Sequence, residues 1–114
     1  MSTLAPRRGW LYWARLDKRR LVLVISPDYR NERATDVIIV PASTVIREAP
    51  THVVLRSGEG GLRTRTVLKC EQVITLPRTD LGEHPLGARL SAARMAAVER
   101  ALLRAIGLAI AEPE

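Results

Sequence analysis

The sequence contains a series of short apolar segments of β-type residues, joined by short connections, which limits the folds open to this chain. The first connection, residues 17–20, has only four residues. Because parallel neighbours need a crossover of about a dozen residues or more, connections this tight predict antiparallel pairing. The expected strands are Trp10–Leu16, Leu21–Ile25, Val37–Val40, Thr51–Leu55 and Thr66–Leu76, the last as one strand or a bent pair.

Turn-forming residues mark the limits of these segments. Residues 26–28 (Ser-Pro-Asp) end the second strand, and the polar stretch as far as Asp36 is expected as a loop. Pro41 is expected to stop the third strand, and the glycine-rich residues 57–61 are expected as a flexible turn. The second strand, Leu21–Ile25, is continuously apolar, which predicts burial on both of its faces.

The last third of the chain changes to a helical period. Apolar residues recur there at intervals of 3, 4 and 4 and form one stripe, made of Met95, Val98, Leu102 and Ile106. Ser91 is of the residue type that caps the first free N–H groups of a helix, and Gly107 fits the position after the last turn. We therefore expect a C-terminal helix over residues 91–107.

Length and composition predict one compact domain. A chain of 114 residues with 46% hydrophobic and 26% charged side chains supports a single core. The expected fold is mainly β (α+β), a small antiparallel SH3-like barrel with a C-terminal helix. It is expected to span residues 1–114, with a disordered tail at 1–7 and a second tail at 109–114.

The sequence favours a cytoplasmic protein without a membrane anchor. No apolar run approaches the roughly 20 residues of a membrane span, and residues 1–8 lack the apolar stretch of a signal peptide. The single cysteine, Cys70, allows no internal disulfide and is expected to pack as a small apolar group. With one Cys and two His, we expect no zinc site of the usual kind, and no metal or other cofactor.

Basic residues are concentrated near the N-terminus. The chain carries 18 Lys and Arg against 12 Asp and Glu, a net charge of +6, and 16 of its basic residues are Arg. Residues 1–33 hold eight basic and three acidic side chains. A GC-rich genome also explains the preference for Arg, and a basic tail explains Arg7 and Arg8. A cluster between the first two strands instead predicts a local polyanion-binding face: Arg15, Lys18, Arg19 and Arg20.

Five segments occur in an order and spacing that one family shares. They are Arg8-Gly9 with Leu11-Tyr12-Trp13, Arg20 to Asp28, Val37 to Thr44, Gly61-Leu62 with Cys70 to Leu76, and the Leu90-Ser91 start of the helix. With these segments the chain resembles, over residues 7–108, the MazF/PemK/Kid toxins, the endoribonuclease halves of bacterial toxin–antitoxin pairs.

The resemblance implies a fold, an activity and partners. It implies a homodimer of SH3-like barrels of the MazF/CcdB type that cuts single-stranded RNA without a metal. The substrate would be mRNA, with tRNA or rRNA as other classes, and the products would carry 2′,3′-cyclic phosphate and 5′-hydroxyl ends. It also implies a cleft at the dimer interface and a cognate antitoxin whose C-terminal segment covers that cleft.

The resemblance also assigns the two catalytic candidates. Arg20 matches the family's catalytic Arg, and a permanently charged guanidinium suits the negative charge that develops on phosphorus. Ser43 matches the active-site Thr, and we assign it to phosphate contact because an unperturbed hydroxyl is a poor base. Thr44 matches the neighbouring Ser and is expected to contact RNA. The alternatives are a solvated surface cation for Arg20 and a turn-capping hydroxyl pair for the other two.

Further RNA-binding candidates follow these segments. Glu71 and Gln72 match family positions that line the RNA cleft, although strand alternation allows both to reach RNA only if the chain bends there. The hairpin cations Lys18, Arg19 and Arg15 are expected to contact phosphate. His52 is expected to be an ordinary strand residue rather than a catalytic one.

Strand alternation also sorts the aromatic residues of the first strand. Trp10 and Tyr12 share one face and are candidates for stacking on bases, whereas Trp13 on the other face is expected in the core.

The chain departs from the family in its first loop, reduced here to about residues 17–19 where many relatives carry roughly ten residues. Leu21 also stands where the family has Pro after the catalytic Arg. Two alternatives to a ribonuclease toxin follow: a CcdB-like toxin that poisons DNA gyrase, or a degenerate RNA-binding module. Residues 111–114 lack the Trp-Gly-Ile end of the gyrase poisons.

Overall fold

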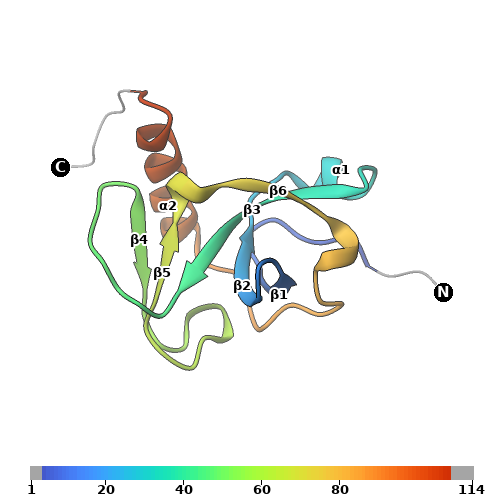
Figure 1. Ribbon diagram of the computed structural model, residues 1–114, viewed down its shortest axis with the longest axis horizontal. Helices are drawn as coiled ribbons and strands as arrows, with labels where there is room; N and C mark the ends of the chain where they lie inside the picture. The colour runs from blue at the N-terminus through green and yellow to red at the C-terminus, as the bar shows by residue number, and fades with distance from the viewer. Residues whose placement is uncertain (1–3, 109–114) are drawn as a thin grey trace.

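The computed structural model describes residues 4–108 (Figure 1). In chain order its elements are β1 (Leu11–Arg15), β2 (Arg19–Val24), α1 (Asp28–Asn31), β3 (Asp36–Ser43), β4 (His52–Leu55), η1 (Glu59–Gly61), β5 (Thr66–Lys69), η2 (Cys70–Gln72), β6 (Ile74–Pro77), η3 (Arg78–Asp80) and α2 (Ala92–Ala105). Of the tail expected at 1–7, residues 4–7 are described: Pro6 is buried, and the Arg7 N–H donates to the Tyr12 hydroxyl at 3.0 Å. Residues 1–3 and the tail 109–114 lie outside the described residues.

The strands pair antiparallel in the order β1-β2-β3-β5-β4, and β6 pairs with β3. Within residues 4–108 no ladder joins β1 to β4, so the sheet curls without closing through hydrogen bonds. The expected fold class, a small antiparallel β domain with a C-terminal helix, is confirmed. None of the helices in this part of the chain has the length and apolarity to span a lipid bilayer.

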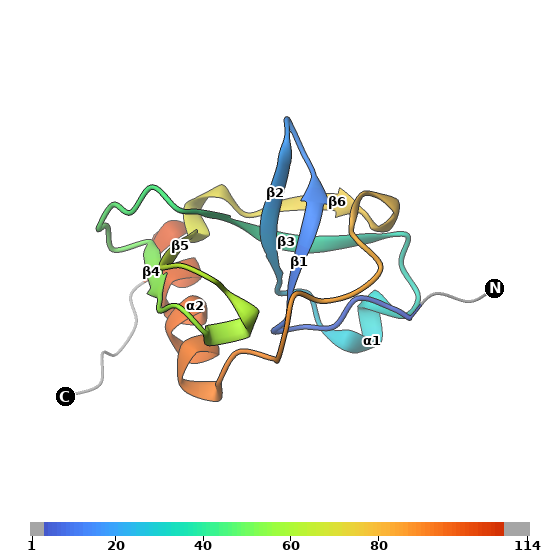
Figure 2. The same ribbon diagram turned by 90° about the horizontal axis from the view of Figure 1, so that it is seen from below.

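β3 is the strand that joins the whole sheet, as Figure 2 shows where it runs behind the β1–β2 hairpin. Its residues 36–39 pair with β6, residues 39–41 with β2, and residues 42–43 with β5. The prediction that Pro41 ends this strand is therefore wrong. Pro41 lies between the residues of β3 that pair with β6 and those that pair with β5. Neither of these two ladders therefore loses a hydrogen bond because proline has no N–H.

The segment 66–76 is the bent strand pair that the sequence allows. The 3-10 turn η2 separates β5 from β6, so one continuous stretch of chain supplies two partners of β3.

Two apolar clusters lie on the two faces of the β2–β3 region. The first packs strand residues such as Leu23, Val40 and Leu68 against Met95 and Val98 of α2. The second collects residues of the opposite face: Tyr12, Ala14, Val22, Val24, Val37, Ile39 and Leu76. Because alternate β2 residues enter different clusters, the burial predicted for both faces of this strand is confirmed.

α2 begins and ends close to the expected positions. The Ser91 hydroxyl accepts the Arg94 N–H at 3.1 Å as an N-cap, and Gly107 follows the helix with a φ of +81°. Met95 and Val98 are buried, but Ile106 is 67% exposed. Its predicted place in the apolar stripe is wrong, because α2 ends at Ala105 and the backbone of Ile106 is no longer helical.

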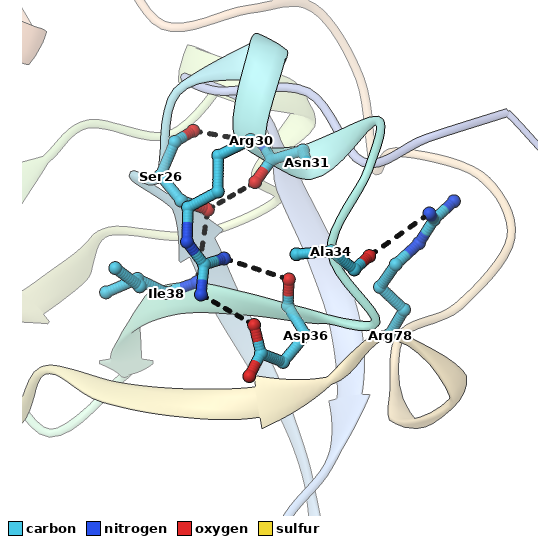
Figure 3. A network of polar contacts seen from close by, with 7 residues as sticks. All are labelled: Ser26, Arg30, Asn31, Ala34, Asp36, Ile38 and Arg78. Carbon is cyan, nitrogen blue, oxygen red and sulfur yellow. Dashed lines mark hydrogen bonds and ion pairs between the residues drawn. The ribbon is translucent and has the colours of Figure 1, made fainter.

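Residues 26–36, predicted as a loop, contain the short helix α1, which a polar network holds (Figure 3). The buried Asn31 donates to the Ser26 carbonyl at 2.9 Å and accepts from the Ser26 hydroxyl. That hydroxyl also accepts the Ile38 N–H at 3.1 Å, which ties α1 to β3. Arg30 adds contacts to the Asp36 carbonyl at 3.0 Å and to its carboxylate at 2.6 Å.

The network predicts a stability effect for Asn31→Ala. Asn31 is fully buried, and the truncation of its side chain removes two hydrogen bonds from Ser26, one at the hydroxyl and one at the carbonyl. We expect a loss of about 2 kcal/mol in the free energy of unfolding, measured by urea denaturation. Arg33→Ala, an exposed neighbour, is the control and should change it by less than about 0.5 kcal/mol. Equal effects of the two substitutions would contradict the role of the network.

A second ion pair joins η1 to α2 and predicts that the stability of the fold depends on pH. The Glu59 carboxylate accepts from the Arg94 guanidinium at 2.8 and 3.1 Å, and this contact lowers the pKa of Glu59 below its ordinary value. A lowered pKa in the folded state stabilises the fold above the ordinary carboxylate value of about 4.3. The stabilisation is lost as the pH falls through the folded value.

Glu59→Gln should therefore destabilise the protein by about 1 kcal/mol at pH 7. The difference from the unchanged chain should shrink progressively as the pH falls below about 4.3, as urea titrations at pH 7 and at a series of lower pH values will measure. A deficit of the same size at every pH would exclude the ionic contribution.

Candidate nucleic-acid interface

The β1–β2 hairpin carries the basic cluster beyond the edge of the sheet (Figure 2). Its turn consists of residues 16–18 only, closed by the Leu16 N–H donating to the Lys18 carbonyl at 3.0 Å. Arg19 and Arg20 already belong to β2, where Arg20 lies opposite Ala14. The turn is thus one residue shorter than the connection 17–20 expected from the sequence, and it lies one residue earlier than the loop 17–19.

Two open hollows adjoin this hairpin. Hollow A is lined by Trp13, Lys18, Arg19, Arg20, Leu21, Ala42, Ser43, Thr44, Val45, Arg47, Thr66 and Lys69. Hollow B is lined by Leu16, Asp17, Arg20, Pro41, Ala42, Ser43, Lys69, Glu71, Gln72, Val73 and Ile74. Hollow A has five cationic side chains and no carboxylate in its lining, which suits a polyanion. The two hollows adjoin at four shared residues: Arg20, Ala42, Ser43 and Lys69.

Arg20 lies at this junction with its guanidinium held by one carboxylate. Its Nε donates to Asp17 Oδ1 at 3.0 Å and one terminal nitrogen donates to Oδ2 at 3.3 Å. These hydrogen bonds lower the pKa of Asp17 and raise the pKa of Arg20. A guanidinium has five N–H groups, so this contact leaves three with which Arg20 can bind a phosphate.

Ser43 ends β3, and its hydroxyl oxygen accepts the Val45 N–H at 3.1 Å. The turn-capping alternative for Ser43 is therefore observed. In this hydrogen bond the Ser43 oxygen acts only as an acceptor. The hydroxyl hydrogen can still donate to an oxygen in either hollow. Thr44 is exposed and lines hollow A but not hollow B.

Glu71 and Gln72 lie in η2 rather than in a regular strand. The bend frees both from strand alternation, so both are exposed and both line hollow B. The Glu71 carboxylate accepts from the Thr51 hydroxyl at 2.9 Å and contacts His52 Nε2 at 3.2 Å. Partial burial acts to raise the pKa of Glu71, but the backbone N–H of Glu71, Thr51 and His52 outweigh it and lower the pKa.

His52 is more than an ordinary strand residue. It lies in β4 with Nδ1 2.9 Å from the Arg47 carbonyl, in addition to its contact with Glu71. It therefore links the loop after β3 to η2. The ring lines neither hollow, so it supports the site without facing into it.

The aromatic residues of β1 are placed opposite to expectation. Trp13 is half-buried, lines hollow A and lies beneath the Arg19 guanidinium at 4.1 Å from the ring centre. Tyr12 is buried in the second apolar cluster, with Trp10 packed against it. The prediction was wrong because the sheet has a core on both faces, and Trp13 belongs to neither apolar cluster but lines hollow A.

Some predicted residues are not brought together, and others were missed. Arg15 lines neither hollow and lies with Arg19 beside residues 79–82 on another side of the hairpin. Arg47 and Lys69 line hollow A without having been predicted. A signal for Lys69 exists in the sequence, because it is a charged residue between Leu68 and Cys70, both fully buried.

Two further groups have no place in the hollows. Cys70 is buried, and burial raises the pKa of its thiol to about 12, which makes it an apolar packing residue, as expected. In residues 4–108, no group of three His, Cys, Asp or Glu side chains is arranged to hold a metal ion.

Comparisons with known proteins agree on one family. Residues 7–106 match the family described as "PemK-like, MazF-like toxin of type II toxin-antitoxin system". Endoribonuclease MazF3 of Mycobacterium tuberculosis is 33% identical over 97 residues, which covers 85% of this chain and 87% of that protein. The chain therefore belongs to the PemK/MazF family of type II toxins.

Solved structures agree with this assignment. The Mycobacterium tuberculosis toxin MazF-mt6 matches with a TM-score of 0.81 and 30% identity, covering 89% of this chain and 99% of that one. A mycobacterial endoribonuclease, solved in complex with its cognate antitoxin, matches with a TM-score of 0.82 and 30% identity over 94% of this chain and 100% of that one. These relatives favour the MazF resemblance over the CcdB alternative.

The position of Trp13 predicts a fluorescence response. In a Trp10→Phe variant, Trp13 is the one remaining tryptophan, and a short single-stranded RNA entering hollow A should change its emission. In the matched Trp13→Phe variant, Trp10 reports from the second cluster and should change little. A response confined to Trp10 would place the RNA away from hollow A.

Proposed function

We propose that this chain is the toxin of a type II toxin–antitoxin system and acts as a sequence-selective, metal-independent endoribonuclease on single-stranded RNA. The observation that carries the proposal is hollow A, with five cations and no carboxylate in its lining and with Arg20 and Ser43 at its junction with hollow B. Membership of the PemK/MazF family and the endoribonuclease relatives support the same activity.

The reaction is a transesterification within the RNA strand. The ribose 2′-oxygen bonds to phosphorus while its proton passes to a base, and the bond from phosphorus to the 5′-oxygen breaks as that oxygen gains a proton. The products have a 2′,3′-cyclic phosphate and a 5′-hydroxyl, and no atom changes its oxidation state. Arg20 stabilises the additional negative charge on the phosphoryl oxygens, and Ser43 donates a hydrogen bond to one of them.

The remaining residues bind the strand on either side of the cleaved bond. Lys18, Arg19 and Thr44 contact phosphates in hollow A, and Arg15 contributes charge from outside it. Glu71 and Gln72 face bases in hollow B through an acceptor and a mixed donor–acceptor group. Cellular mRNA is the expected substrate, with tRNA and rRNA as the other classes.

The proposed partners follow from the same surface. A second copy of the chain forms the homodimer, and a cognate antitoxin covers the hollows with its C-terminal segment in the cytoplasm. Carboxylates of such a segment would pair with the cations of hollow A, which have no acidic neighbour in its lining. The mycobacterial endoribonuclease solved in complex with its cognate antitoxin supports the proposal of an antitoxin partner.

Cleavage of a mixed RNA in the presence of EDTA tests the activity. The purified protein should produce defined cuts whose mapped ends are cyclic phosphate and 5′-hydroxyl. Arg20→Ala should lower the cleavage rate by about a hundredfold or more, because it removes a charged donor from the reacting phosphate. The exposed Arg63, which lines neither hollow, gives the charge-matched control Arg63→Ala.

Two outcomes contradict different parts of the proposal. An absence of EDTA-resistant cuts would reject the ribonuclease activity. Cuts that persist unchanged in Arg20→Ala would reject the role of Arg20 while leaving the activity in place.

A further inference from the structure

Lys69 is the cation that the sequence did not single out and that the structure places beside Arg20. It ends β5 between Leu68 and Cys70, which are both fully buried, and its own side chain is only half-buried. Hollow B has two cations in its lining, Arg20 and Lys69, and both also line hollow A. Lys69 therefore shares with Arg20 a place at the junction, next to Ser43.

The acidic groups near Lys69 are already engaged by other side chains. Asp17, which lines hollow B, is bound through both carboxylate oxygens to Arg20. Glu71, two residues along the chain, is bound to Thr51 and to His52, the register partner of Lys69 in β4. Within residues 4–108 the Lys69 ammonium itself has no ion pair or side-chain hydrogen bond, so its charge is uncompensated at the junction.

One guanidinium can stabilise only part of the negative charge that develops in this reaction. As the 2′-oxygen attacks, the phosphoryl group gains negative charge on two non-bridging oxygens, which lie on different sides of phosphorus. A cation that contacts the second oxygen stabilises the transition state more than the ground state, because the charge there grows during the reaction.

We propose, on the basis of the function inferred above, that Lys69 is a further catalytic residue. Its ammonium donates a hydrogen bond to the non-bridging phosphoryl oxygen that Arg20 does not bind, with Ser43 between the two cations. Lys69 neither gives up nor takes a proton in this step. The RNA strand then crosses the junction from hollow B to hollow A, with the scissile phosphate between Arg20 and Lys69.

Single-turnover cleavage at saturating protein tests this role. Lys69→Met keeps the length of the aliphatic side chain and removes the charge, and it should lower the cleavage rate about a hundredfold. The dissociation constant for a non-cleavable 2′-deoxy analogue should rise less than about tenfold, in line with the loss of one phosphate contact. Lys69→Arg should restore a large part of the rate, and Arg63→Met, which removes an equal charge outside the hollows, should leave it unchanged.

A phosphorothioate at the scissile phosphate distinguishes a catalytic role of Lys69 from a merely structural one, through the cleavage rates of its two diastereomers. One of its two diastereomers replaces the oxygen proposed to contact Lys69 by sulfur, a poorer hydrogen-bond acceptor. The unchanged enzyme should be slowed by this diastereomer, and Lys69→Met should lose that sensitivity. If Lys69→Met does not fold, Lys69→Gln, which also removes the charge, is compared with the unchanged enzyme in the same way.

The outcomes separate this inference from the function on which it rests. A failure of the unchanged protein to cut RNA would overturn the proposed function. Cleavage by the unchanged protein with an equal rate for Lys69→Met, or with weaker binding but an unaltered rate at saturation, would overturn the role of Lys69 alone. Equal sensitivity to the phosphorothioate in all variants would do the same.

Discussion

The site depends on one interruption along the edge of β3 that pairs with β6 and β5. Two residues of β3, Val40 and Pro41, pair with β2 but lie between its ladder to β6 and its ladder to β5, opposite the longer turn η2. A proline fits there because neither of these two ladders uses its N–H. The extra residues of η2 must leave the plane of the sheet, and they turn Glu71 and Gln72 outward. A continuous ladder would have buried one of the two side chains and removed the wall of hollow B.

Ion pairing separates basic residues that hold segments of the fold together from those that can bind substrate. Arg30 and Arg94 each bind a carboxylate from another segment, and these pairs join α1 to β3 and α2 to η1. Arg20 is intermediate, since its partner Asp17 is three residues away in the same hairpin and is itself exposed. Such a pair holds the guanidinium in place without linking distant parts of the fold, so substrate can compete for it at little cost to folding.

The sequence predicts most of the strands and the C-terminal helix, because these follow from local patterns, whereas most residues of the two hollows were assigned through the family resemblance. Alternation, turn residues and the Ser91 cap identify the elements without knowledge of their neighbours. The wrong predictions concern residues whose structure depends on segments distant in the sequence. Pro41 continues a strand because of what lies opposite it, and Trp13 lines hollow A instead of joining either apolar cluster. Lys69 was missed because the register that places it near Arg20 is a property of the sheet and not of its own segment.

The short hairpin turn has a kinetic consequence. Three residues, 16–18, closed by a hydrogen bond between Leu16 and Lys18, cannot reach across either hollow as a lid. This turn therefore does not have to open before an RNA strand enters, and we expect the encounter rate to depend on diffusion and on the attraction of the exposed cations. Such a rate falls steeply as salt screens the charges, so a protein without a lid over its site should sense the ionic strength of its surroundings through the rate at which substrate arrives.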